Sequence, residues 1–190
     1  TEPLAAFQEP ERLPARMGYP TDFNAYLRIG ADGRVACFVG KVELGQGAMT
    51  ALAQILAEEL DVSFDSVDMV MGDTDLCPWD MGTFGSRSIR FFGPPLREAA
   101  AEARVVLLMM AAERLGVDMG RLTVNEGVVS DKGNSGRRIT YAELTRGKVI
   151  ERHLPAKPAV KKVSEFRVMG KSHRRTDAGL TFDMATGVAH

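Results

Sequence analysis

Two glycine-containing loops carry the residue types and spacing best suited to binding chemistry. The first is the tripeptide Gly45-Gln46-Gly47, which lies where a strand pattern gives way to a helical one. A helix start offers free backbone N–H groups and a partial positive charge, and flanking glycines let an anion or a cofactor edge approach them closely. Gln46 adds a side chain that both donates and accepts hydrogen bonds, which suits a heterocycle edge or an oxo group. Taken alone, the tripeptide is read more simply as a tight turn without a ligand.

The second loop is MGTFGSRS, residues 81–88, which leads into another helical region about forty residues further on. It sets the hydroxyls of Thr83, Ser86 and Ser88 and the guanidinium of Arg87 beside glycines, a combination typical of a phosphate or pyrophosphate cradle. Taken alone, it also fits an ordinary serine-capped helix start. If the strands that precede the two loops are parallel neighbours, both loops lie at one end of the sheet and face one ligand.

The elements that must position these loops follow the order β-β-α-β-α-β-β-α. This order predicts an α+β fold, in which a mixed β-sheet packs against two principal helices, 47–60 and 96–116. An alternative for the second helix is a short turn that begins near Ser86 and kinks at Pro94 and Pro95. The remaining expected elements are strands over 23–29, 35–44 and 66–72, a hairpin centred on 125–127, and a short helix capped by Thr140 with Glu143 completing a capping box.

Three segments of different composition suggest the domain organisation. Residues 1–22 carry four prolines and little periodicity, which predicts an extended arm. Residues 23–147 hold both loops and the regular elements, and form the expected binding domain. Residues 148–190 are basic and aperiodic, so we expect an extended connector to a following domain or partner. The Arg174-Arg175 pair would face solvent or that partner, with contact to a phosphate as the alternative.

Several polar or aromatic groups have simpler explanations than chemistry. Glu58 and Glu59, near the end of the first principal helix, are read as a solvated helix end. Trp79 fits a side chain that stacks on a cofactor or lines a channel, and equally one that plugs a loop into the core. Cys37 and Cys77 match no zinc-ligand spacing, are too few for a four-thiolate cluster, and carry no signal for a disulfide. We therefore expect any metal to arrive inside a cofactor.

The composition excludes two classes of partner. The chain has 24 basic and 25 acidic residues, and the formal net charge of −1 provides no field for nucleic acid or for an anionic membrane. Hydrophobic residues make up 45% of the chain and charged residues 26%, which is typical of a globular domain. No run of about 18 apolar residues occurs, so we expect no bilayer-spanning helix.

Three motifs, taken in order, carry a family resemblance. They are ELGQG at 43–47, GDT at 72–74 and GTFGSRS at 82–88. This combination resembles the molybdopterin-binding region of the xanthine dehydrogenase and aldehyde oxidase family, over about residues 20–150. Within that family the chain looks most like the large subunits of the isoquinoline 1-oxidoreductase and aldehyde dehydrogenase type, in which the Gly-Gln-Gly block lies near the N-terminus.

The resemblance implies a cofactor, a reaction and a set of binding residues. The family binds a molybdenum–pterin cofactor, in bacteria as molybdopterin cytosine dinucleotide, and hydroxylates aldehydes or N-heterocycles with water as the oxygen source. Residues 23–147 would then be the molybdopterin-cofactor-binding domain, with no residue implied as catalytic or as a metal ligand. The residues implied to contact the cofactor are Leu44, Gly45, Gln46, Gly47, Thr83, Phe84, Gly85, Ser86, Arg87 and Ser88.

The resemblance also implies partners outside this sequence. In the family, electrons leave the pterin for iron–sulfur clusters, so we expect a 2Fe-2S partner subunit and a further cytochrome or FAD subunit. No segment here matches the surroundings of the family's catalytic glutamate, so we expect the chain to act with the remainder of a molybdenum large subunit, whether it is a natural subunit or a piece of one. Members of this subgroup are often exported folded, which implies the periplasm, with the cytoplasm as the alternative.

Two other classes of function remain open on the residues alone. A non-catalytic module that binds a dinucleotide or a phosphorylated ligand would use the same two loops. A purely structural subunit would leave both loops empty. The three hypotheses differ in whether the native assembly contains molybdenum and a cytosine nucleotide. The small-molecule substrate is not readable, because the residues that would face it are not identified in this chain.

Overall fold

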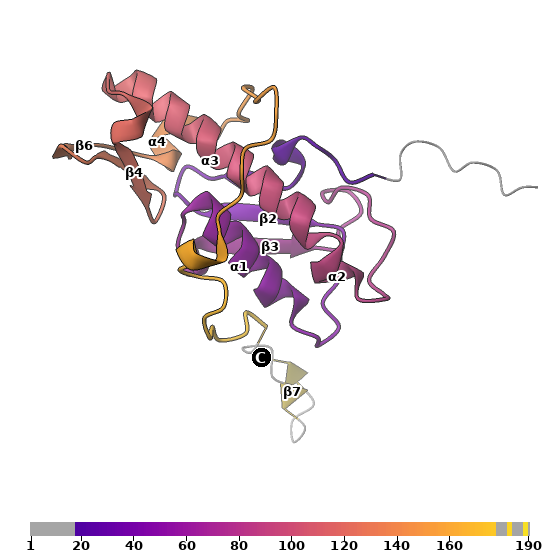
Figure 1. Ribbon diagram of the computed structural model, residues 1–190. Helices are drawn as coiled ribbons and strands as arrows, with labels where there is room; N and C mark the ends of the chain where they lie inside the picture. Colours follow the sequence, from indigo (N-terminus) through magenta and orange to yellow (C-terminus); the bar gives the residue numbers. More distant parts are fainter. Residues whose placement is uncertain (1–17, 178–181, 184–187, 190) are drawn as a thin grey trace, which may run out of the picture.

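The structure, a computed structural model, describes residues 18–177 and the short segments 182–183 and 188–189. It confirms the α+β class, with helices packed on small β-sheets (Figure 1). Most of the predicted N-terminal arm, residues 1–17, lies outside the described residues. The strands are β1 (Leu27–Ile29), β2 (Val35–Val39), β3 (Val67–Met71), β4 (Leu122–Asn125), β5 (Val128–Asp131), β6 (Asn134–Thr140), β7 (Phe182–Asp183) and β8 (Val188–Ala189), and the α-helices are α1 (Ala48–Leu60), α2 (Arg87–Arg90), α3 (Gly93–Leu115) and α4 (Tyr141–Thr145).

The central sheet has the strand order β1-β2-β3 and mixes both pairing directions. β1 pairs antiparallel with β2, whereas β2 and β3 are parallel, with Val35 opposite Val67 and Val39 opposite Met71. A parallel pair needs a crossover connection, and α1 provides it by packing against the sheet. The parallel pairing confirms the arrangement expected for the two loops, because the carboxyl ends of β2 and β3 lie at the same edge.

Helix α1 is held against the sheet by an apolar stripe. Leu52, Leu56 and Leu60 are spaced four residues apart, so they share one face of the helix, and all three are fully buried. The helix begins after Gly47, whose φ of 79° turns the chain out of the preceding loop, and ends at Asp61 in the left-handed conformation. The predicted helix over 47–60 is confirmed to within one residue.

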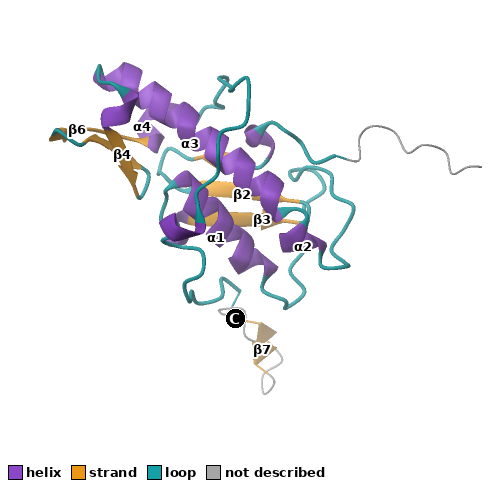
Figure 2. Cartoon of the chain, viewed as in Figure 1, coloured by secondary structure: helices purple, strands orange, loops and turns teal. Residues whose placement is uncertain are grey.

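Helix α3 lies beside α1 over the same face of the central sheet (Figure 2). A run of buried alanines on α3 lets the two helices approach closely. The helix begins at Gly93, with Pro94 and Pro95 in its first turn, where a missing backbone N–H costs nothing. The separate short helix α2 precedes it, so the turn near Ser86 in the alternative is confirmed, whereas the prolines lie in the first turn of α3, as the main prediction has them.

A second sheet packs at the far end of α3. Its order is β4-β5-β6, all antiparallel, so β1 to β6 are divided between two sheets instead of lying in one, and β7 and β8 form a separate two-stranded sheet. β6 was not predicted, because its residues are mostly polar and exposed and show no apolar alternation. The predicted capping box is confirmed at the start of α4, where Glu143 N–H donates to the Thr140 hydroxyl and Thr140 N–H donates to the Glu143 carboxylate.

Two predicted strands are shorter than expected. The strand over 35–44 stops at Val39, because the chain there passes close to another loop: a Cβ on Gly40 would lie 2.7 Å from the carbonyl oxygen of Pro78. The strand over 23–29 begins only at Leu27, since residues 23–25 form a 3-10 turn that Asp22 caps.

Residues 148–177 follow an extended course and contain only one short 3-10 turn, Val163–Glu165. In Figure 1 this segment crosses α3 and then runs beside α1. It covers the end of α1, so the prediction that Glu58 and Glu59 form a solvated helix end is wrong. Their exposed fractions are 1% and 0%, because hydrogen-bond donors of residues 161–169 replace water around them.

Two further sequence expectations concern membranes and thiols. Among the described residues no helix is both long and apolar enough to cross a bilayer. Cys37 is buried and Cys77 is partly buried, and both are free thiols, so no disulfide joins them. Burial raises the pKa of the Cys37 thiol, which keeps it protonated inside the sheet.

Candidate functional site

The two glycine loops meet around one open hollow of about 570 Å³. The first loop enters it from the start of α1, and the second enters it from the segment before α2. Of the ten residues predicted to bind a cofactor, all except Gly45 line this hollow. Ala48, Ala51, Ile89 and Arg90 line it as well and were not predicted. The structure therefore brings together the residues that the sequence placed forty positions apart.

Two direct contacts join the loops. The backbone N–H of Val42 donates to the Thr83 hydroxyl oxygen at 2.8 Å, so this hydroxyl serves the loop junction. Below it, the Lys41 ammonium donates to the Asp80 carboxylate at 2.6 Å and to the Gly82 carbonyl at 2.7 Å. Both charged side chains are buried, at 0% and 2% exposure, so each compensates the other's lost hydration. This ion pair fixes the stem of the second loop.

The backbone at the hollow is bent and left open. Gly45, Gly47 and Gly85 have φ values of 90°, 79° and 57°, a range that favours glycine. A Cβ added at any of the three would meet nothing within 4 Å, so protein packing is not what requires these glycines. Ser86 also has a positive φ of 57°, which is uncommon for a residue with a side chain. Bent, uncovered backbone of this kind fits the close approach of a ligand.

The Gln46 side chain braces its own loop. Its Oε1 accepts a hydrogen bond from the Leu44 N–H, and its Nε2 donates to the Val42 carbonyl at 3.0 Å. A carboxamide has two acceptor positions and two N–H donors, so one of each remains for a ligand. Gln46 therefore shapes the loop and lines the hollow at the same time.

The start of α1 is less free than the sequence suggested, because Glu43 occupies part of it. Its carboxylate accepts hydrogen bonds from the Gly47 and Met49 N–H groups at 2.9 and 2.8 Å. Burial by itself would raise the pKa of Glu43, but the N–H groups of Met49, Gly47 and Gly45 together hold it below its ordinary value. The prediction of an uncapped helix start is thus wrong in part. The available signal was an acidic residue four positions before the N-cap, Gly47.

The rim of the hollow combines apolar surface with cations. Leu44 and Phe84 are 72% and 54% exposed, which is unusual for large apolar side chains. The Arg87 guanidinium lies over the rings of Phe84 and Phe91, with centroid distances of 5.5 and 5.2 Å. Flat apolar surface beside a guanidinium suits a ligand with both a planar ring and an anionic group. Trp79 is 58% exposed, so the interpretation that its side chain anchors the loop in the hydrophobic core is wrong.

The hollow has donors for an organic anion and no protein metal site. Within the described part of the chain, no group of three or more His, Cys, Asp or Glu side chains could hold a metal ion. The polar groups at the hollow are backbone amides, hydroxyls and guanidinium groups, which recognise phosphates and heterocycle edges. A second, larger hollow of about 760 Å³ lies between α3, α4 and residues 146–152, and none of the ten predicted residues line it.

The chain belongs to the molybdopterin cofactor-binding domain family, whose model matches residues 6–189. This membership confirms the resemblance drawn from the two glycine loops. The ligand by which this family is named is the molybdopterin cofactor.

Relatives and solved structures agree with this assignment. The chain is 40% identical over 152 residues to one of the subunits of nicotinate dehydrogenase from Pseudomonas putida, covering 80% of this chain and 13% of that protein. It is 38% identical to the beta subunit of isoquinoline 1-oxidoreductase from Brevundimonas diminuta, covering 70% and 18%. Quinoline 2-oxidoreductase from Pseudomonas putida 86 superposes with a TM-score of 0.53 at 27% identity, over 62% of this chain and 15% of that one. The chain thus spans less than a fifth of the length of each.

Proposed function

We propose that this chain is the cofactor-holding part of a molybdenum hydroxylase large subunit. The observation that carries the proposal is the convergence of the two glycine loops on one open hollow with apolar and guanidinium walls. Membership of the molybdopterin cofactor-binding domain family supports the choice of ligand. The names of the relatives, nicotinate dehydrogenase and isoquinoline 1-oxidoreductase, support an N-heterocycle as the substrate of the whole assembly, and the family resemblance implies an aldehyde as the alternative.

In this proposal the chain's own residues bind and orient the cofactor and transfer no proton. Leu44 and Phe84 offer apolar surface to the pterin, while Arg87 and the bent backbone at Gly85 and Ser86 offer donors to its phosphates. Gln46 presents one remaining donor and one remaining acceptor to a heterocycle edge or an oxo group. The molybdenum centre, when bound, supplies the oxidation of a substrate C–H bond with water as the oxygen source.

We further propose the dinucleotide form and the partners that the family resemblance implies. The cofactor is molybdopterin cytosine dinucleotide, and electrons pass to iron–sulfur clusters in a 2Fe-2S subunit, with a cytochrome or FAD subunit as a further partner. The names of the relatives, which mark them as subunits and large chains, support a multi-subunit assembly.

The periplasm is the proposed compartment, and fractionation of the native host tests this proposal. Activity released with the periplasmic contents supports a periplasmic location, and activity only in the cytoplasm contradicts it.

A non-catalytic module for a dinucleotide or phosphorylated ligand is the second candidate. The hydroxyl- and guanidinium-rich second loop favours it, because the same groups would hold any pyrophosphate.

Analysis of the native assembly distinguishes the two candidates. The assembly that contains this chain is purified from its host, and its molybdenum is measured together with the nucleotide released on denaturation. Molybdenum and cytidine monophosphate in near-equal amounts support the leading proposal. A nucleotide without molybdenum favours the non-catalytic module, and neither component contradicts both.

A further inference from the structure

One face of α1 carries polar side chains that hold a distant part of the chain. Thr50, Gln54 and Glu58 are spaced four residues apart, so they form a stripe along the helix. All three contact the segment 161–177, which we call the strap. The apolar stripe of the same helix faces the core, so this second stripe is a separate feature of the sequence.

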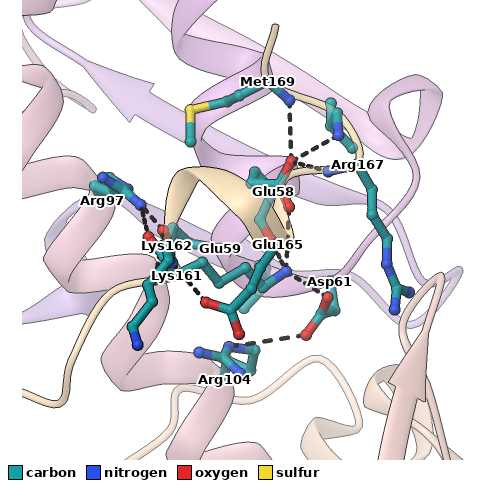
Figure 3. A network of polar contacts seen from close by, with 12 residues as sticks. Glu58, Glu59, Asp61, Arg97, Arg104, Lys161, Lys162, Glu165, Arg167 and Met169 are labelled. Atoms are coloured by element: carbon teal, nitrogen blue, oxygen red, sulfur yellow. Dashed lines mark hydrogen bonds and ion pairs between the residues drawn. The ribbon is translucent and has the colours of Figure 1, made fainter. Parts of the chain in front are cut away.

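The strongest attachment of the strap is at Glu58. One carboxylate oxygen, Oε2, accepts hydrogen bonds from three consecutive backbone N–H groups, those of Arg167, Val168 and Met169, at 2.8, 2.6 and 3.0 Å. Figure 3 shows these bonds converging on the buried carboxylate. Three donors on one charged oxygen fix the direction of the strap at this point as well as its position.

Neighbouring carboxylates hold the beginning of the strap. Glu59 accepts the Lys161 N–H at 3.1 Å and the Arg97 guanidinium at 2.6 Å. The Lys161 ammonium donates to Asp61 at 2.5 Å (Figure 3). The end of α1 therefore carries three carboxylates, each paired with a cation or with backbone donors.

From Glu58 the strap follows α1 back towards the start of the helix. Gln54 donates to the carbonyls of Val168 and Lys171 at 3.3 and 3.1 Å. One turn further on, the Thr50 hydroxyl accepts the Thr176 N–H at 3.0 Å. The strap thus runs antiparallel to the helix, and each polar residue of the stripe receives the next part of it.

This course ends at the first glycine loop. The Arg175 guanidinium donates to the Gly45 carbonyl at 2.9 Å and lies between two carboxylates, Asp177 at 2.5 Å and Glu43 at 3.8 Å. The remaining hydrogen bonds of residues 44–47 within the described chain are local ones with residues 42–51. Arg175 therefore connects an otherwise exposed loop to the body of the helix.

We propose that Arg175 is a positioning residue of the cofactor site, delivered by the strap and holding the Gly45-Gln46-Gly47 loop in its binding conformation. The cofactor part of this inference rests on the proposed function. The link between Arg175 and the loop rests on contacts alone. Arg175 does not line the hollow, so its effect on a ligand passes through the Gly45 carbonyl and through Glu43, which caps α1.

Arg174 provides a matched control for the test. It is the neighbouring arginine, it is exposed, and it makes no hydrogen bond or ion pair with the residues that the structure describes. Arg174→Met and Arg175→Met therefore remove the same group one position apart. Only the second breaks the contact with the loop.

The experiment uses the purified native assembly and measures two quantities for each variant. Hydrogen exchange of the amides of residues 44–49 reports loop order, and molybdenum per chain reports cofactor retention. For Arg175→Met we expect roughly fivefold faster exchange and a severalfold fall in molybdenum, because one charge-assisted hydrogen bond is lost. Arg174→Met should match the wild type in both. Arg175→Lys, which keeps the charge without the planar fork, should give an intermediate result and serves if Arg175→Met folds poorly.

The outcomes separate this inference from the proposed function. If exchange in Arg175→Met equals that in Arg174→Met, Arg175 does not hold the loop and the inference is overturned. Faster exchange with unchanged molybdenum also overturns it, because the order that Arg175 gives the loop would then have no effect on cofactor retention. A wild-type assembly that lacks molybdenum contradicts the proposed function, while the exchange comparison still decides whether Arg175 orders the loop.

Discussion

The two ends of α1 are built in opposite ways. At its start, the loop is exposed, contains two glycines with positive φ, and faces an open hollow. At its end, Glu58 and Glu59 are buried, and distant parts of the chain supply their hydrogen-bond donors. The comparison teaches that a charged group at a helix end need not face water, and that the end left open is the one suited to a ligand. The predictions below test this difference, beginning with the largest expected effect.

Removing the carboxylate at the closed end should destabilise the protein most. In Glu58→Ala, three backbone N–H groups of the strap lose their acceptor at a partly buried position. We expect a loss of about 3–5 kcal/mol in the free energy of unfolding at pH 7, measured by chemical denaturation. Glu98→Ala, an exposed change on α3, is the control and should cost well under about 1 kcal/mol. Equal losses for the two variants would mean that the strap does not stabilise α1.

Acid should weaken the closed end in a defined direction. Burial tends to raise the pKa of Glu58, but the N–H groups of residues 168, 169 and 167 and the Lys161 ammonium together lower it. A carboxyl with a lowered pKa stabilises the fold above its unfolded-state value, about 4.3, and loses this contribution as the pH falls through the folded-state value. The stability difference between wild type and Glu58→Gln should therefore be largest near neutral pH and shrink towards pH 3. Denaturation curves at several pH values measure this stability difference. A difference independent of pH would contradict the stabilisation of the Glu58 carboxylate by the N–H groups and Lys161.

A side chain at the open end should cost less. Gly47→Ala places a Cβ at a φ of 79°, where nothing lies within 4 Å, so only backbone strain opposes the change. We expect a loss of roughly 1–2 kcal/mol in the free energy of unfolding, as for an L-residue in the left-handed region. Gly18→Ala is the control, because Gly18 also has open space but no positive φ in that range. If both variants have wild-type stability, the bent backbone at Gly47 carries no strain.

The smallest effect on stability, with a larger one on the cofactor, is expected at Gln46. Gln46→Ala removes two exposed hydrogen bonds within the loop, so the free energy of unfolding should fall by less than about 1 kcal/mol. Molybdenum per chain in the purified assembly should fall severalfold. Gln46→Glu keeps the acceptor for the Leu44 N–H and loses the donor to the Val42 carbonyl. It therefore distinguishes the contribution of the acceptor from that of the donor. Unchanged molybdenum in both variants would remove Gln46 from the site.

Local patterns predicted much of the fold and both loops. The apolar spacing of α1, the prolines at the start of α3, and the capping box at Thr140 depend on near neighbours, and the structure confirms each of them. The convergence of the loops followed from one topological expectation, the parallel pairing of β2 and β3. That the loops bind the cofactor stays a prediction.

The features that depend on distant partners were not predicted. Glu58 and Glu59 look solvated within their own helix, and their burial is explained by residues of the strap more than 100 positions later, together with Arg97 beside Glu59. The same holds for Arg175, whose acceptor at Gly45 lies 130 positions earlier. β6 was missed for another reason: its exposed polar residues pair through the backbone alone, which leaves no side-chain pattern.

The strap also constrains the order of events when the protein is made. The partners of Glu58 lie 109 to 111 residues downstream of it, and closing so long a loop is entropically costly until many contacts can form together. During synthesis Glu58 therefore lacks these three donors until the strap has left the ribosome. The contact between Arg175 and Gly45 forms near the end of this series. The first glycine loop is consequently among the earliest parts of the binding site to be translated and among the latest to be fixed, so a cofactor would meet a finished site only after residue 175 has been made.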